Sequence, residues 1–408
     1  MSLTGTMSIT RSADGVTLTP DGWSHSGTPD AYGYVSVLGG GLYMPVSSPG
    51  LPRVHFADPG EGLWWVGAAF GEPVAEALRS AVGDDGDGDA PPAVVADVAL
   101  TPAGASACRA AAGAWLHRWW PAANPGIPAL DVPLLEIELA LNAWQAEVCL
   151  GNTVIAEALL SRNLPRLTAL YASIDWSVAP ERLPAHGRTI GLAARAALEV
   201  CDPSRADLGE LRALHAKATD SLWEHALDAW GGEAWSAAAA ELRAPVALAA
   251  GSSGTDEHRT IADWALLSPR SVAGRDGDVR WSETMDPDGN AVVGVVVDAG
   301  TSPRGALWAR VLHPGDDEPA AVIHLTREGS AYRGTSEPIA LASGTRVEVF
   351  DPMFDRGPRT DGTAAARALR TRVLRAIDDR LAAAGRPFDA DEPASPFLAE
   401  LAARGALP

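Results

Sequence analysis

The most apolar stretch of the chain carries three glutamates: Glu136, Glu138 and Glu147. A carboxylate in such surroundings must be paired or have its pKa raised, and catalytic sites use both conditions. Glu136 and Glu147 are separated by roughly three turns of an α-helix, so the spacing predicts that they project from one face. His117 and Arg118, from a preceding helical stretch, could meet them there. These groups could transfer protons in a hydrolase or lyase, although a structural salt bridge explains the same pattern.

A second pair of candidates lies further along the chain. His225 and Asp228 stand three positions apart in a predicted amphipathic helix, and Glu224 precedes the histidine. Residues at this spacing meet on a helix surface and could exchange a proton if that face lined a cleft. A hydrogen bond on the helix surface is the simpler interpretation.

Tryptophan is abundant, with 14 copies in 408 residues. Aromatic side chains concentrate at ligand sites and at protein interfaces, where they act as anchors. Packing in the hydrophobic core explains them equally. Five clustered tryptophans are therefore the candidate binding residues: Trp64, Trp65, Trp115, Trp119 and Trp120.

The motifs of several enzyme classes do not match this chain. Lys217 is the only lysine and has no glycine loop before it, which argues against a P-loop and against a Schiff-base enzyme. Residues 251–254 miss the spacing of a nucleophile elbow. The nine histidines and three cysteines form no zinc-binding pattern, and the aspartates of residues 83–92 miss the calcium-loop register. We expect no bound metal and no cofactor.

Hydrophobic periodicity predicts an α+β protein of several domains. Short alternating segments between glycines and prolines indicate strands at the N-terminal end, and Ala-rich amphipathic stretches indicate helices in the centre. Alternating β-branched runs return after residue 277, and a last amphipathic helix follows. The predicted division is a β-rich region at 1–70, a mainly helical domain at 71–270 with an acidic linker at 83–92, a β-sandwich at 277–352, and a helical segment at 360–408.

The predicted β-sandwich resembles immunoglobulin and fibronectin type III modules in architecture. Strand-like segments at 292–297, 307–312 and 345–350 are separated by turn sequences at 286–290 and 328–330. The region has no cysteine pair, so the resemblance concerns architecture only.

Charge and composition limit the possible partners. The chain has 52 acidic and 32 basic residues, a net charge of −20, so its mean field repels phosphate backbones and anionic lipids. It lacks an apolar run of the ~18 residues that a membrane span requires, and its first residues lack the pattern of a secretory signal. We therefore expect a cytoplasmic protein without nucleic-acid or membrane partners. The preference for arginine over lysine is typical of a GC-rich genome, such as that of an actinobacterium.

These observations favour a noncatalytic interaction or scaffold component of a bacterial multi-protein assembly, with another protein as its partner. Fold analogy does not establish function. One alternative is a hydrolase or lyase that uses the carboxylates and histidines of the helical domain. Another is a regulator that senses a small ligand, with residues 251–256 as its hinge. The sequence does not predict the oligomeric state.

Overall fold

The computed structural model describes residues 4–12, 14–23, 32–46, 50–83, 93–122, 124, 126–179, 182–183, 185–218, 258–274, 277–285, 290–300, 306–314, 316, 318–342, 344–354, 362–384 and 395–405. The chain divides into two compact units. Unit 1 consists of Met1–His117, Asp131–Arg243 and Asp379–Pro408, and unit 2 of Arg118–Leu130 and Ala244–Asp378. Each unit contains helices and one antiparallel sheet, which confirms the α+β class. The four-part division expected from the sequence stays a prediction.

The sheet of unit 1 has six strands in the order β3-β4-β5-β2-β1-β6. Buried and accessible residues alternate along β1 to β5, as the period of a half-buried strand requires. One face therefore packs inward and the other is accessible. The strands are β1 (Thr4–Ser12), β2 (Gly15–Pro20), β3 (Tyr32–Val37), β4 (Gly40–Pro45), β5 (Arg53–Phe56) and β6 (Ala93–Ala99).

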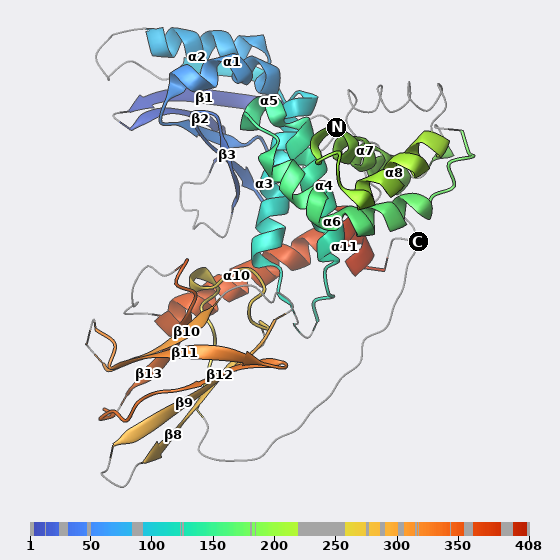
Figure 1. The fold of residues 1–408 in the computed structure, drawn as a ribbon. Coiled ribbons are helices and arrows are strands. Elements are labelled where there is room, and N and C mark those ends of the chain that lie inside the picture. Colours follow the sequence, from blue (N-terminus) through green and yellow to red (C-terminus); the bar gives the residue numbers. More distant parts are fainter. Residues whose placement is uncertain are drawn as a thin grey trace. The chain divides into compact units, whose positions relative to one another are not determined.

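The helices between residues 59 and 172 share one hydrophobic core with the inner face of this sheet. Figure 1 shows the first two helices lying along the sheet. Cys108 and Cys149 are buried and carry free thiols. The helices are α1 (Pro59–Phe70), α2 (Glu72–Gly83), α3 (Pro102–Trp119), α4 (Val132–Gln145), α5 (Glu147–Leu150), α6 (Val154–Ala172), α7 (Ala185–Val200), α8 (Ala206–Ala218) and α11 (Leu398–Ala403).

Strand β6 was not expected, because it follows the acidic run within the region predicted to be helical. Its sequence, Ala-Val-Val-Ala-Asp-Val-Ala, contains three β-branched valines, and it pairs with β1 at the edge of the sheet. The backbone of Asp97 has a φ of 55°, where the pairing register shifts. The sheet is thus completed by residues that lie beyond the boundary predicted at residue 70.

The sheet of unit 2 has seven strands in the order β13-β10-β11-β12-β9-β8-β7. Strand β11 pairs with β10 through Ala321–Leu325 and with β12 through Thr326–Glu328. All seven strands are therefore hydrogen-bonded in one continuous sheet, and the two-sheet sandwich stays a prediction. The strands are β7 (His258–Thr260), β8 (Val279–Met285), β9 (Ala291–Asp298), β10 (Leu307–Leu312), β11 (Ala321–Glu328), β12 (Ala331–Thr335) and β13 (Arg346–Phe350).

Two buried ion pairs lie within unit 2. Arg310 on β10 donates to Glu348 on β13 at 2.6 Å, and both side chains are buried. Arg370, on helix α10 (Gly362–Ala383), donates to Asp278 at 3.0 Å. A short 3₁₀ helix, η3 (Trp264–Leu266), places the ring of Trp264 against the guanidinium of Arg370. Both arginines therefore connect separate segments of the unit.

The helices in the part of the chain that the structure describes are too short or too polar to span a membrane.

Candidate functional site

The expected contact between His117 and Glu136 is present. Nε2 of His117 lies 3.0 Å from Oε1 of Glu136, and Arg162 and Asn163, on α6, donate to the same carboxylate at 3.2 and 2.8 Å. Burial raises the pKa of Glu136, but these hydrogen bonds and the charge of Arg162 outweigh it and lower the pKa to about 2. A carboxylate this acidic is a weak proton acceptor at neutral pH. The side chain of Glu136 therefore connects its own helix, α4, to α3 through His117 and to α6.

Glu147 does not share a helix face with Glu136, contrary to the prediction. Helix α4 ends at Gln145, and Ala146 leaves the helical conformation, with φ −95° and ψ 13°. Glu147 begins the separate helix α5 and is exposed. Helical spacing predicted the wrong face because no single helix continues through this position. His225 and Asp228 lie outside the described residues.

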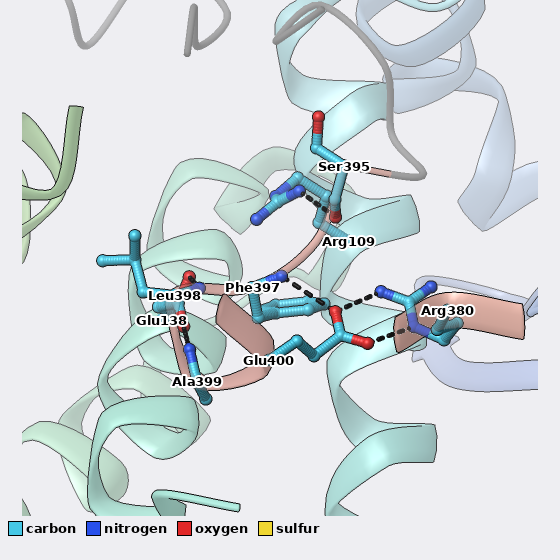
Figure 2. A network of polar contacts seen from close by, with 8 residues as sticks. All are labelled: Arg109, Glu138, Arg380, Ser395, Phe397, Leu398, Ala399 and Glu400. Atoms are coloured by element: carbon cyan, nitrogen blue, oxygen red, sulfur yellow. Dashed lines mark hydrogen bonds and ion pairs between the residues drawn. The ribbon is translucent and has the colours of Figure 1, made fainter. Parts of the chain in front are cut away.

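Glu138 faces a different set of partners from Glu136. Its side chain is 2% exposed, and its two oxygens accept the backbone N–H groups of Leu398 and Ala399 at 2.7 and 3.0 Å (Figure 2). These donors form the first turn of α11, whose amides have no acceptor within the helix. Burial raises the pKa of Glu138 to about 8. Glu138 therefore attaches the C-terminal segment to α4.

Two buried arginines complete the attachment of the C-terminal segment. Arg380 donates to both oxygens of Glu400 at 2.6 Å, and Glu400 also accepts the backbone N–H of Phe397 (Figure 2). Arg109 donates to the carbonyl of Ser395 at 2.9 Å, with its guanidinium 4.6 Å from the ring centre of Phe397. Burial lowers the pKa of Arg109. We call Arg109, Glu138, Arg380 and Glu400 the anchor network.

The five candidate tryptophans occupy different environments. Trp65, Trp115 and Trp120 are buried, and Trp65 donates its indole N–H to the carbonyl of Leu38 at 3.1 Å. Trp64 is 58% exposed. Trp119 and Trp120 line a cleft in unit 2 together with Trp264, but its volume of about 20 Å³ holds roughly one water molecule. Packing thus explains three of the five.

Arg118 lines the same cleft, and its expected contact with Glu136 stays a prediction. It donates to the backbone carbonyls of Trp264 and Leu267. Its guanidinium lies between the rings of Trp119 and Phe354, at 4.8 and 4.6 Å from their centres. Burial lowers the pKa of Arg118 to about 10. Arg118 holds backbone segments of unit 2 together.

The outer face of the unit 1 sheet carries a cluster that the sequence analysis missed. The pairing register places Tyr34, Tyr43 and Arg53 side by side on β3, β4 and β5. The rings of Tyr34 and Tyr43 are 5.1 Å apart, and the guanidinium of Arg53 lies 5.8 Å from the Tyr43 ring centre. Tyr34 is 49% exposed. The three side chains thus form an accessible row across neighbouring strands.

Two neighbouring contacts extend this row. Trp23 and Tyr32 stack with their ring centres 4.7 Å apart, and Tyr32 lies on the same side of β3 as Tyr34. On β5, His55 lies 3.0 Å from the hydroxyl of Thr17. We call this surface the tyrosine face. It consists of Trp23, Tyr32, Tyr34, Tyr43, Arg53 and His55.

Gly41 leaves the space that the ring of Tyr34 occupies. A Cβ atom at position 41 would lie 2.6 Å from the Tyr34 ring, so any side chain there would displace the ring. Burial and the neighbouring Tyr34 raise the pKa of Tyr43, while the charge of Arg53 lowers it. The alternation of Tyr32, Tyr34 and Tyr43 with buried residues was a signal for this face. Their adjacency required the strand register.

Comparison with family models, with curated proteins and with solved structures returned no match to this chain. Function is therefore inferred from the chemistry of the residues themselves.

Proposed function

We propose that this protein is a noncatalytic interaction component of a bacterial multi-protein assembly in the cytoplasm, and that the tyrosine face binds another protein. The row formed by Tyr34, Tyr43 and Arg53 is the observation that carries this proposal. Tyrosine, tryptophan and arginine are the residue types that most often contribute binding energy at protein interfaces. The tyrosine face brings all three together.

The β-sheet makes this surface rigid before a partner arrives. Strand β4 is hydrogen-bonded on both sides, to β3 and β5, and the ring of Tyr34 lies over Gly41. Tyrosine has few rotatable bonds, so its immobilisation in a complex costs little entropy. Hydroxyl side chains of Ser8, Thr17 and Thr19 occupy the neighbouring strands and can adapt their hydrogen bonds. Rigid aromatic rings beside adaptable hydroxyls suit protein recognition.

The hydrolase or lyase alternative receives less support from the helical core. The low pKa of Glu136 suits a permanent ion pair better than proton transfer, and Glu138 is used to bind the first turn of α11. The ligand-sensing alternative depends on residues 251–256, which lie outside the described residues. Both alternatives stay predictions.

The test is affinity purification of the tagged chain from its native host, followed by mass spectrometry and sizing of the complex. Tyr34→Ser and Arg53→Ala alter the tyrosine face, and Trp64→Ser is the matched control because Trp64 is an exposed aromatic residue on α1. We expect a stoichiometric partner that the control retains and the two face variants lose. Recovery of the chain alone, or retention of the partner by every variant, would contradict the proposal.

A further inference from the structure

Arg53 differs from the other arginines at aromatic rings in unit 1. Arg380 is paired with Glu400, and Arg109 donates to a backbone carbonyl. Arg53 forms no ion pair with any residue that the structure describes, and its Nε atom is enclosed without a hydrogen-bond partner there. A guanidinium presents its donors in a planar fork that matches a carboxylate. Among the described residues Arg53 is therefore an unpaired guanidinium on an accessible surface, and its terminal nitrogens, rather than the enclosed Nε, are the donors that can meet a carboxylate of a partner.

The charge around Arg53 contrasts with that of the whole chain. The chain has a net charge of −20, yet the outward positions of the described strands β1 to β5 carry neither aspartate nor glutamate. These positions hold tyrosine, threonine, serine, glycine, proline, Arg53 and His55. Charges in solution at physiological ionic strength interact over about 8 Å, so this local surface determines what can dock there.

We infer that the tyrosine face recognises an acidic segment of the partner protein, with one carboxylate bound by Arg53 and the adjoining side chains lying on the rings of Tyr34 and Tyr43. This inference rests on the proposed function and specifies the chemistry of the partner. A nucleic acid fits less well, because its closely spaced phosphates need several basic groups, and Arg53 is the only arginine or lysine at the outward positions of the described strands β1 to β5. A short segment with one or two carboxylates needs only one such group.

The experiment selects random dodecapeptides displayed on phage against the immobilised full-length protein. We expect the selected peptides to be enriched in aspartate and glutamate. An enriched peptide is then labelled and titrated against wild type, Arg53→Glu and Arg53→Gln by fluorescence polarisation. We expect both substitutions to weaken binding about 10- to 30-fold, as for the central residue of an interface.

The matched control is Arg79→Glu, which makes the same change of charge on α2, away from the accessible face of the sheet. We expect it to leave the affinity unchanged. Equal weakening by Arg79→Glu and Arg53→Glu would overturn the inference, because the effect would then follow from net charge. Thermal melting checks that each variant is folded, and Arg53→Gln retains the test if Arg53→Glu does not fold.

Two further outcomes would overturn the inference. One is enrichment of neutral or basic peptides, and the other is binding of a labelled thymidine oligonucleotide that Arg53→Glu abolishes. The native partner distinguishes this failure from failure of the proposed function. If Tyr34→Ser loses that partner while Arg53→Glu retains it, the tyrosine face binds a protein but does not recognise a carboxylate on it. If both variants retain it, the proposed function itself is wrong.

Discussion

The anchor network and the tyrosine face lie in the same unit, and both place arginine against aromatic rings. Arg109 lies 4.6 Å from the ring centre of Phe397, and Arg53 lies 5.8 Å from that of Tyr43. In the anchor network, each arginine also donates to an acceptor in the chain. Arg53 has no such acceptor among the described residues. Both arginines make a cation–π contact. Whether the N–H groups of an arginine already have acceptors in the chain therefore distinguishes a structural arginine from one that can bind a partner.

The sharpest test of the structural side of this comparison is Glu400→Ala. The substitution leaves Arg380 and the backbone N–H of Phe397 buried without their acceptor. We expect a loss of about 3 to 5 kcal/mol in the free energy of unfolding, the usual cost of removing one partner of a buried pair. Urea denaturation measures it. Arg79→Ala, at an exposed ion pair on α2, should change the midpoint little. Similar losses of unfolding free energy in Glu400→Ala and Arg79→Ala would show that the buried ion pair contributes no more to stability than the exposed one.

Adjacent tryptophans extend the same comparison to apolar residues. Trp65 is fully buried and bonded to the carbonyl of Leu38, so Trp65→Ala should cost about 3 to 5 kcal/mol in unfolding free energy. Trp64 is largely exposed, and Trp64→Ala should change stability by less than about 0.5 kcal/mol. Thermal or urea unfolding of both variants checks this prediction. A large loss for Trp64→Ala would show that the exposed ring has a structural role.

The contributions of Glu136 and Glu138 to the free energy of unfolding should change with pH in opposite directions. The folded chain holds a proton on Glu138 up to about pH 8, while the unfolded chain releases it near 4.5. Stability therefore falls as pH rises through this range. Glu136 has a folded pKa of about 2, so its contribution is lost as pH falls from 4.5 towards 2.

Two isosteric variants separate these contributions. Glu138→Gln should flatten the decline in stability between about pH 5 and pH 8, and Glu136→Gln should flatten the decline below about pH 4.5. The measurement is the urea midpoint at a series of pH values. Curves for both variants parallel to that of wild type would show that neither carboxylate has the shifted pKa.

A small change in stability is also expected for a substitution on the tyrosine face. Tyr34 is about half exposed, so Tyr34→Ser should alter the unfolding free energy by less than about 0.5 kcal/mol. Chemical denaturation of the purified variant checks this value. A residue that contributes little to folding but is essential for partner binding would confirm the contrast with the anchor network. A loss comparable to that of Glu400→Ala would place Tyr34 among the structural residues.

Local patterns in the sequence predicted several elements correctly. The apolar stretch that carries Glu136 forms the buried helix α4, and the strand-like segment at 307–312 forms β10. These predictions succeeded because side-chain periods of 3.6 and 2 are properties of neighbouring residues. The prediction for Glu147 failed because the helix ends at Gln145, and no proline or glycine at that point marks the end.

The sequence by itself determined the charge of the chain, the mixture of helices and strands, and the contact between His117 and Glu136 as one possibility among several. Only the tertiary structure decided that Glu138 binds α11, which lies 260 residues further along the chain. Likewise, the strand register brought Tyr34, Tyr43 and Arg53 into one row. Periodicity shows which face a residue occupies within its own element. The neighbours across elements are chosen by the packing of the whole unit, which minimises exposed apolar surface and unpaired polar groups together.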